Sequence, residues 1–390
     1  MNGRELILRY GCNPHQIPAR IHTPSDSLPI TVLNGNPGYI NLLDALNSWQ
    51  LVTELRQSLN LPAAASFKHI SPAGAAVGVP LSERLRQAYL VSKNLELSPL
   101  ASAYARARGS DRISSFGDWV ALSDVVDVST ARLLKPEVSD GVIAPGYEPE
   151  ALSILQQKRQ GKYIVIEIDP SYEPPSIETR EVFGICFEQQ RNRIIPNIEH
   201  LQNIVTRDRE ITSFAKRDLL VGMITLKYAQ SNSVCLVSDG QTIGIGVGQQ
   251  SRIGCTRIAT EKARQWHLRQ HPKVVNLPFC PNLKRTNQDN LIFEYLHSDL
   301  IVMEDRSRFF TELPEEISES EKLQWLTNLK DVSLASDGYI PFRDNIDVAN
   351  KTGVKYIVQP GGSLRDEDTI SACDEYGMVM MFSNLRLFHH

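Results

Sequence analysis

The stretch Ser66-Phe67-Lys68-His69-Ile70-Ser71-Pro72-Ala73-Gly74 decides how the chain is interpreted. An apolar run from Leu61 to Phe67 leads into it and predicts a buried strand. The Ser-Pro pair that follows the Lys-His pair suits the N-cap and first position of a helix. We therefore expect a strand that gives way to a helix at the Lys-His pair. In open α/β sheets, strand ends of this kind form the edge where ligands bind.

Lys68 and His69 are the candidate catalytic residues of this edge. A histidine can accept and release a proton near neutral pH. A neighbouring lysine can stabilise negative charge that develops during a reaction. The alternative is structural, because adjacent residues of a strand point to opposite faces of the sheet. Both side chains reach one site only if the backbone turns there.

Composition indicates an ordinary globular protein. The chain has 390 residues, of which 42% are hydrophobic and 22% charged, and a formal net charge of -4. This length allows two or three domains or one duplicated unit. The weak net charge argues against a nucleic-acid partner or a membrane surface. An anionic ligand would have to be bound by local arginines and lysines.

Cysteine usage and the first residues predict a cytoplasmic protein. Six cysteines, at positions 12, 186, 235, 255, 280 and 373, include no CxxC pair. This pattern is typical of reduced thiols and removes the zinc-cysteine signatures. Met1 to Tyr10 lacks the apolar core of a secretion signal, and no apolar run reaches membrane-spanning length.

Alternating strand and helix patterns predict α/β layers. Helices are expected over 41–59, 100–108, 213–230 and 251–270, and a single strand over 180–187. The proline-rich segment 170–175 reads as a linker, so we place the units at 1–175 and 176–390, the second with a helical excursion at about 271–330. Two pairs of short segments weakly resemble each other and suggest an internal duplication. These echoes pair 68–71 with 231–233 and 140–146 with 356–361.

Two glycine-containing stretches in the second unit have distinct interpretations. Asp239-Gly240 between apolar runs predicts a β-hairpin. Gly244 to Arg252 invites a dinucleotide-binding interpretation, but Gln249 occupies the position of the third glycine. We interpret it as a strand end that leads into a helix capped by Ser251, whose N-terminus favours anions.

Several further positions carry side chains suited to a ligand. Arg9 and Tyr10 pair a guanidinium with a phenol, Gly117 precedes an apolar run, and Asp140 opens a short strand. The C-terminal stretch Arg386 to His390 offers an arginine and two histidines. Each has a structural alternative: a terminal loop, a turn-forming aspartate, or a solvated tail.

Eight peptides in this order resemble the AICAR formyltransferase family, the C-terminal part of the bifunctional purine-biosynthesis protein, and in particular its animal form. The matching stretches run from Leu8 to Gln16, Ser66 to Gly78, Ala103 to Asp127, Ser139 to Gly146, Arg217 to Val234, Gly240 to Thr256, Ser336 to Asp347 and Asn384 to His390. In that family an IMP cyclohydrolase domain precedes the Arg-Tyr-Gly motif, which here starts at residue 9. The resemblance therefore implies a monofunctional transformylase, with a separate IMP cyclohydrolase closing the ring.

The resemblance also implies a fold, a reaction and an assembly. The fold would be two cytidine-deaminase-like α/β/α units without zinc, which agrees with the missing deaminase signature. The reaction would move a formyl group from 10-formyltetrahydrofolate to the 5-amino group of AICAR, giving FAICAR and tetrahydrofolate. The family forms homodimers in which both subunits build each site.

Site residues follow from the resemblance, position by position. His69 matches the general base, and Lys68 the residue that stabilises the transition state. The positions that match the AICAR site are Arg9, Tyr10, His69, Gly117, Asp140, Asn232, Arg252, Phe342, Arg386 and His390. Phosphate would fall chiefly to Arg9 and Arg386, and the carboxamide to Asn232 and the Phe342 backbone. The positions expected to contact folate are Ile253, Asp347, Asp366 and Glu367.

Departures from the animal pattern leave two features open. The loop Gln359-Pro360-Gly361-Gly362 differs, so the folate contacts near it are unsettled. Some members bind potassium near the turn at 230–233, where Ala229 here replaces a threonine. Three other activities remain alternatives: a formate- and ATP-dependent ligase, an inactive nucleotide-binding regulator, and a zinc deaminase.

Overall fold

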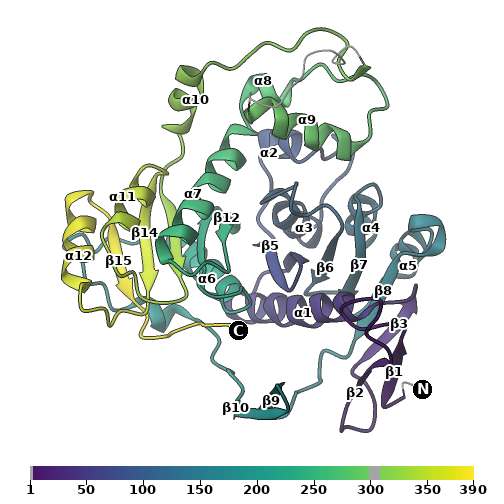
Figure 1. Cartoon of the computed structure of the whole chain (residues 1–390). Helices are drawn as coiled ribbons and strands as arrows, with labels where there is room; N and C mark the ends of the chain where they lie inside the picture. Colours follow the sequence, from purple (N-terminus) through teal and green to yellow (C-terminus); the bar gives the residue numbers. More distant parts are fainter. Residues whose placement is uncertain (1–2, 298–307) are drawn as a thin grey trace.

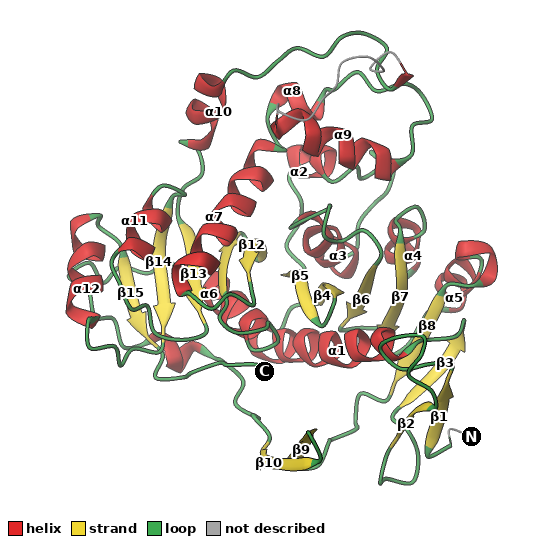
Figure 2. Cartoon of the chain, in the orientation of Figure 1, coloured by secondary structure: helices red, strands yellow, loops and turns green. Residues whose placement is uncertain are grey.

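One mixed sheet of eleven strands forms the centre of the molecule (Figures 1 and 2). The computed structural model describes residues 3–297 and 308–390. The strands follow the order β15-β14-β13-β11-β12-β5-β4-β6-β7-β8-β3 across the sheet. The first half of the chain therefore builds one side of the sheet, and the second half builds the other.

The first half supplies six strands. Their bounds are β3 (Ile30–Asn34), β4 (Ala63–Lys68), β5 (Ser71–Val77), β6 (Asp118–Leu122), β7 (Ser139–Ala144) and β8 (Ile164–Ile168). Strand β4 pairs antiparallel with both β5 and β6, whereas β6, β7 and β8 are parallel to one another. Strand β3 adds an antiparallel edge beside β8.

The second half repeats this pattern with β11 (Val234–Ser238), β12 (Gln241–Gly246), β13 (Val332–Ser336), β14 (Val354–Gln359) and β15 (Val379–Phe382). Strand β11 pairs antiparallel with β12 and β13, and β13, β14 and β15 are parallel. The two halves meet where β12 pairs antiparallel with β5, with Gln241 opposite Ala76. Strand β7 thus corresponds to β14, as the echo between 140–146 and 356–361 predicts. The other echo is wrong, because the turn at 68–71 corresponds to the turn at 238–241.

Helices cover both faces of the sheet, which gives three layers. One face carries α1 (Tyr39–Leu59) and α6 (Ser213–Leu226), which contact each other and share one apolar core. The opposite face carries α2 (Glu83–Ala88), α3 (Pro99–Gly109), α4 (Val128–Leu134) and α5 (Pro149–Gln156) in the first half. In the second half it carries α7 (Arg252–Leu268), α11 (Asp344–Asn350) and α12 (Asp366–Glu375). Alternate residues of β4 divide between the two cores, as the period of a strand requires.

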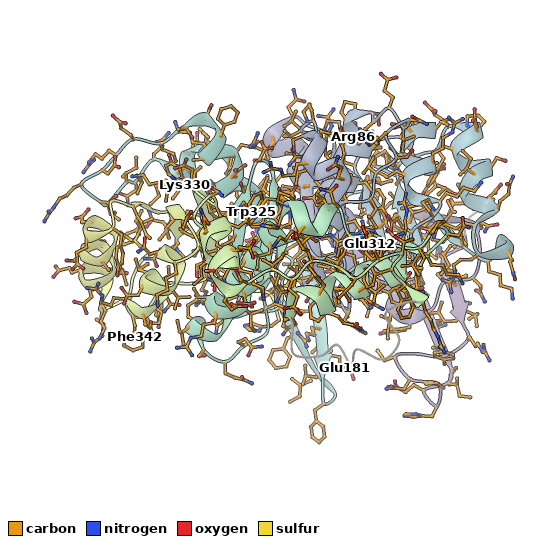
Figure 3. The ribbon with its side chains drawn as sticks, turned by 90° about the horizontal axis from the view of Figure 1, so that it is seen from above. Arg86, Glu181, Glu312, Trp325, Lys330 and Phe342 are labelled. Carbon is orange, nitrogen blue, oxygen red and sulfur yellow. The ribbon has the colours of Figure 1, made fainter. Side chains whose placement is uncertain are left out.

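Smaller elements lie outside the sheet. Two hairpins, β1 (Glu5–Leu8) with β2 (Ala19–His22) and β9 (Ile177–Val182) with β10 (Ile185–Gln190), form separate two-stranded sheets. Figures 1 and 3 show the second hairpin, which carries Glu181, projecting from the body. Short 3-10 turns occur at η1 (Lys158–Gly161) and η2 (Ile198–Leu201). Helices α8 (Pro272–Val275), α9 (Arg285–His297) and α10 (Glu319–Leu326) contribute to a core of their own.

No helix in the described ranges is long and apolar enough to cross a bilayer.

The predicted helix after Lys68 and His69 is wrong. Residues Ser71–Val77 form strand β5, and the chain reverses in a two-residue hairpin at His69-Ile70. Extended chain is needed here because α3 crosses β5 closely: a Cβ atom on Gly74 would lie 2.1 Å from the carbonyl oxygen of Ala107. The backbone therefore does turn at the Lys-His pair, which is the condition for both side chains to serve one site.

Two other predictions have clear outcomes. The single strand over 180–187 is wrong, because residues Phe183 and Gly184, both with positive φ, turn the chain between β9 and β10. The hairpin at Asp239-Gly240 is confirmed, as is the Ser251 cap, whose hydroxyl accepts from the Gly254 N–H at 3.3 Å. A Cβ on Gly246 would lie 2.1 Å from the Cys255 carbonyl oxygen. That glycine therefore permits close packing of β12 on α7.

Candidate active site

The His69-Ile70 turn displays the candidate base at the edge of the sheet. Both residues have positive φ, 53° and 57°, as the tightest hairpins require. This region costs about 1–2 kcal/mol per non-glycine residue, and it is least favourable for a β-branched side chain such as Ile70. The carboxylate of Asp44 on α1 accepts the Ile70 N–H at 2.7 Å. The surrounding structure therefore maintains a turn that the two residues would not adopt alone.

Lys68 reaches sideways to the loop before β6. Its Nζ donates to the carbonyl oxygen of Phe116 and lies 6.0 Å from the centre of the Phe116 ring. Gly117 follows with φ 73°, and a Cβ placed on it would lie 4.0 Å from the lysine Nζ. Two of the expected site residues, Lys68 and Gly117, therefore lie side by side.

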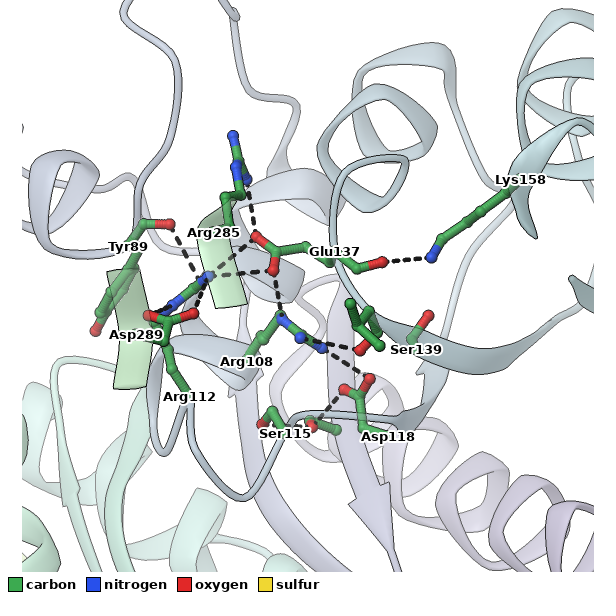
Figure 4. A network of polar contacts seen from close by, with 12 residues as sticks. Tyr89, Arg108, Arg112, Ser115, Asp118, Glu137, Ser139, Lys158, Arg285 and Asp289 are labelled. Atoms are coloured by element: carbon green, nitrogen blue, oxygen red, sulfur yellow. Dashed lines mark hydrogen bonds and ion pairs between the residues drawn. The ribbon is translucent and has the colours of Figure 1, made fainter. Parts of the chain in front are cut away.

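A network of buried polar and charged side chains supports the loop before β6 (Figure 4). The Ser66 hydroxyl donates to Asp118 at 2.6 Å and lies 2.7 Å from the Ser115 hydroxyl. Asp118 is fully buried and accepts from Arg108 at 2.7 Å. Arg108 in turn donates to Glu137 at 3.0 Å. The residues that bracket Gly117 are thus tied to α3 and to the segment before β7.

The same network continues to the helical excursion. Glu137 also accepts from Arg112 at 3.1 Å and from Arg285 of α9 at 2.8 Å. Arg112 donates to Asp289 of α9 at 2.8 Å. Burial raises the pKa of Glu137, but the three arginines outweigh it and bring the pKa to about 2. Glu137 is therefore ionised over the whole useful pH range, as an anchor between three cationic side chains must be.

Asp140, Arg9 and Tyr10 have partners of their own. Asp140 lies at the start of β7 and pairs with Arg159 at 2.9 Å. It is also close enough to Asp44 to raise the pKa of that carboxyl. Arg9 is exposed after β1, with its guanidinium 5.8 Å from the centre of the Tyr10 ring.

A cavity of about 670 Å3 opens in the second half, and five predicted site residues line it. They are Asn232, Arg252, Ile253, Phe342 and Arg386, together with Gln250, Ser251, Gly338, Tyr339, Pro341, Asn345, Pro360, Gly361 and Phe388. The predicted residues come from the segment before β11, the start of α7, the loop after β13 and the C-terminal segment. Figure 3 shows Phe342 at the end of the molecule away from the first half.

Arg252 is held rigidly in the wall of this cavity. It forms an ion pair with the fully buried Asp337, and it donates to the Asn232 side-chain oxygen at 2.7 Å and the Ser233 carbonyl at 2.9 Å. Its Nε is buried and has no hydrogen-bond partner among the described residues. Arg252 therefore brings a positive charge of fixed position to the cavity wall.

The C-terminal segment forms hydrogen bonds with Asp337 and Ser231, beside the cavity. The Leu387 N–H donates to the Asp337 carbonyl at 2.9 Å, and the His389 N–H donates to the Ser231 hydroxyl at 3.0 Å. The Arg386 guanidinium lies 4.8 Å from the centre of the Phe388 ring, and the His390 ring meets Phe388 edge-on at 5.8 Å. Arg386 thus lines the cavity, and His390 contacts Phe388, which also lines it.

The residues expected to contact folate are dispersed. Ile253 lines the cavity, whereas Asp347 on α11 accepts from Arg343 at 3.2 Å and from the Tyr376 hydroxyl at 2.9 Å. Asp366 accepts the N–H groups of Gly362 and Ser363, at 2.8 and 3.1 Å, and so orders the loop beside the cavity. Glu367 lies in the first turn of α12.

Strand register places both groups of residues on one edge of the sheet. The end of β4 lies beside the start of β6, and the start of β7 lies next to it. The start of β11 lies beside the ends of β12 and β13, and β14 and β15 end on the same side. Because β5 and β12 are antiparallel, the start of β5 and the end of β12 face the same way. The edge therefore combines the end of β4 and the starts of β5, β6 and β7 with the start of β11 and the ends of β12, β13, β14 and β15.

Asp44, Asp118 and Asp337 are buried carboxylates beside the candidate site that were not among the predicted site residues. Asp118 and Asp337 fall within the matching stretches Ala103 to Asp127 and Ser336 to Asp347. Asp44 lies one and two turns from Ser48 and Leu51 on a buried stripe of α1. A charged residue on an apolar stripe was the available signal.

Comparisons with known proteins identify the family of this chain. The family described as AICARFT/IMPCHase bienzyme matches residues 2–262. The bifunctional purine biosynthesis protein PurH of Aquifex aeolicus is 30% identical over 388 residues, and those of Roseobacter denitrificans and Magnetococcus marinus are 29% identical over 389 and 395 residues. Each alignment covers 98% of this chain but 59% of the relative. The relatives are enzymes of purine biosynthesis, and this chain belongs to the AICARFT/IMPCHase bienzyme family.

Proposed function

We propose that this chain transfers a formyl group from 10-formyltetrahydrofolate to the 5-amino group of AICAR in purine biosynthesis. The observation that carries the proposal is the cavity at the sheet edge, where Asn232, Arg252, Ile253, Phe342 and Arg386 converge from separate segments. Cationic groups suit the phosphate and carbonyl oxygens of a nucleotide, and aromatic walls suit flat rings. The Lys-His pair lies on the same edge.

In the proposed mechanism, His69 acts as the general base. The 5-amino group is a weak nucleophile because its lone pair is delocalised into the imidazole ring and the carboxamide. As its nitrogen forms a bond to the formyl carbon, the imidazole takes the amine proton and the carbonyl oxygen becomes an oxyanion. The bond from that carbon to the folate nitrogen then breaks, and the proton passes to the departing nitrogen. General-base assistance of this kind is worth about 10²–10⁴-fold.

Lys68 stabilises the oxyanion in this mechanism. Its ammonium is held against the Phe116 carbonyl beside Gly117, where the missing side chain leaves room for a substrate. A fixed donor that meets developing charge contributes about 10²–10³-fold. Arg9, Asp140, Arg386 and His390 bind AICAR in this proposal, and Asp347, Asp366 and Glu367 lie on the folate side.

We also propose that each site is completed by a second copy of the chain, in a homodimer. The proposed catalytic pair lies in the first half of the chain, and the cavity lies in the second half. The repeated strand order of the halves further supports two duplicated, cytidine-deaminase-like units. The pairing of separate half-sites is tested by the complementation experiment described in the Discussion.

The test is formation of tetrahydrofolate from 10-formyltetrahydrofolate and AICAR, followed by absorbance with no ATP present. The product is assayed as FAICAR and, separately, as IMP. Turnover without ATP is expected and excludes the formate ligase. Absence of turnover while AICAR still binds would contradict the proposal and favour a regulatory protein. Appearance of IMP would contradict the expectation that another protein closes the ring.

Lys68→Ala provides the second arm of this test. We expect turnover to fall about 10²–10³-fold because the oxyanion loses its donor. Lys135→Ala is the matched control, since Lys135 is exposed at the end of α4. An unchanged rate in Lys68→Ala would remove the lysine from the mechanism.

A further inference from the structure

We propose that Asp44 is a positioning residue: its carboxylate holds the His69-Ile70 turn in the left-handed conformation that presents the His69 imidazole to the substrate. The inference rests on the proposed formyl transfer. It assigns a role to a buried charged group that the mechanism itself does not use.

The first argument is the contact. Asp44 lies on α1 beneath the turn, with 6% of its surface exposed. Its Oδ1 accepts the Ile70 N–H at 2.7 Å, across 26 residues of chain. The backbone N–H of His69 also lies close enough to favour the ionised carboxylate. The carboxylate thus accepts a hydrogen bond from one N–H of the turn and lies near the other.

The second argument is the unfavourable backbone. Two-residue hairpins with positive φ at both positions normally contain asparagine, aspartate or glycine. The corresponding hairpin of the second half follows this rule with Asp239-Gly240. The first half instead places histidine and isoleucine there, at φ 53° and 57°. Such outliers persist where the surroundings over-determine the backbone, and they cluster at functional sites.

The third argument is the cost of keeping a carboxyl group at this position. Burial raises the pKa of Asp44 from 3.8 to about 6, against the lowering effect of the two turn N–H groups and of His69. Asp140 at the start of β7 raises it further. Asp44 forms no ion pair with an arginine or lysine of the described residues, and burying an acid without such a partner is costly. Among the described residues, its side-chain hydrogen bond goes to the Ile70 N–H of the turn.

The experiment compares four variants with the parent. Asp44→Ala removes the acceptor, Asp44→Asn retains an oxygen acceptor without the charge, and Ile70→Gly makes the left-handed turn favourable without support. The double variant Asp44→Ala/Ile70→Gly tests rescue. Ser48→Ala is the matched control, because Ser48 is buried on α1 and its hydroxyl bonds only to carbonyl groups of α1.

Two readouts are taken: steady-state kcat and KM for AICAR, and peptide-level hydrogen exchange over residues 61–75. Asp44→Ala is expected to lower kcat by about 10–100-fold, with KM changed less than about threefold, and to speed exchange at the turn. Ile70→Gly should restore most of the loss in the double variant. Asp44→Asn and Ser48→Ala should stay within about threefold of the parent.

Three results would overturn the proposal. The first is unchanged kcat and exchange in Asp44→Ala. The second is a loss that glycine at position 70 does not restore, which would indicate a role other than supporting the turn. The third is a loss of more than about tenfold in Asp44→Asn with exchange unchanged, which would assign the effect to charge. If Asp44→Ala does not fold, the double variant decides: folding and turnover restored by glycine at position 70 support the proposal, and a double variant that also fails to fold overturns it.

Exchange separates this proposal from the proposed function. If the parent shows no turnover, formyl transfer fails. Exchange at the turn in the Asp44 variants then still reports whether this carboxylate holds it.

Discussion

At the scale of single residues, two buried ion pairs support the two halves of the candidate site. Asp118 with Arg108 lies behind the Lys-His pair, and Asp337 with Arg252 forms the wall of the cavity. Both carboxylates are fully buried. Removing one member of such a pair leaves an uncompensated charge, whereas an exposed pair contributes little.

Asp337→Ala tests this difference. It leaves the Arg252 guanidinium buried without its carboxylate, so we expect a loss of about 3–5 kcal/mol, seen as a lower urea midpoint. Asp26→Ala is the control, because Asp26 pairs with Arg4 at 2.7 Å but is 99% exposed, and we expect a change within about 0.5 kcal/mol. Equal effects of the two substitutions would contradict the account.

The pH dependence of stability tests the buried state of Asp44. Its pKa in the folded protein, about 6, lies above the ordinary 3.8, so the folded state binds the proton more tightly. The stabilising effect of that proton is complete below pH 3.8 and is lost as pH rises through 6. Relative to Asp44→Asn, the parent should lose at most about 3 kcal/mol between pH 4 and 6.5. Parallel unfolding curves for the two proteins over this range would show an exposed carboxyl.

At the scale of elements, hydrophobic period and strong turn signals were predictive. The helix expected over 41–59 is α1 (Tyr39–Leu59), and the Asp239-Gly240 hairpin and the Ser251 cap are as predicted. The His69-Ile70 hairpin was missed because neither residue is a turn former, and Ser71-Pro72 resembles a helix start. Its conformation depends on Asp44 and on α3, which are distant in sequence, so local propensity could not reveal it.

Close packing of α3 on β5 makes Gly74 a sensitive position. Gly74→Ala would place a Cβ 2.1 Å from the Ala107 carbonyl oxygen, so β5 or α3 must move. We expect a loss of about 1–3 kcal/mol, measured as a lower Tm. In the control Gly146→Ala the nearest atom lies at 3.5 Å, an ordinary contact, and Tm should hardly change.

Helix α9 is tied to the first half through Asp289, which accepts from Arg112 and Arg269. Asp289→Ala leaves both arginines buried without this carboxylate, and we expect a loss of about 3–5 kcal/mol. Proteolysis around α9 should also become faster. Glu150→Ala, which breaks an exposed pair with Arg132, is the control. Unchanged proteolysis in Asp289→Ala would show that this carboxylate does not hold α9 in place.

At the scale of the whole molecule, the sheet explains why candidate residues far apart in sequence share one edge. The alternation of strands and helices predicted α/β layers, but not that the halves join through β5 and β12 into one sheet. That contact is a single strand pairing between small and polar residues, with no sequence signature. Strand register decides which strand ends meet at this edge. Only the structure therefore shows that Lys68 and His69 lie in one half and the cavity-lining residues in the other.

Subunit complementation tests the homodimer with shared sites. His69→Ala and Arg252→Ala should each lack activity. The first substitution removes the proposed base, and the second removes a cation from the cavity wall. If one site combines both groups from two subunits, random mixing yields heterodimers with one intact site, or about a quarter of parental activity. Failure to recover activity after unfolding and refolding the mixture, while the refolded parent is active, would place both groups of a site in one chain.

The central claim is that His69 moves a proton during formyl transfer at this sheet edge. The most direct measurement is kcat for tetrahydrofolate formation in His69→Ala beside the parent, with AICAR affinity measured by calorimetry. His22→Ala is the control, since His22 is exposed on β2. We predict a loss of about 10²–10⁴-fold in kcat with affinity nearly unchanged. A parent-like kcat in His69→Ala would contradict the account.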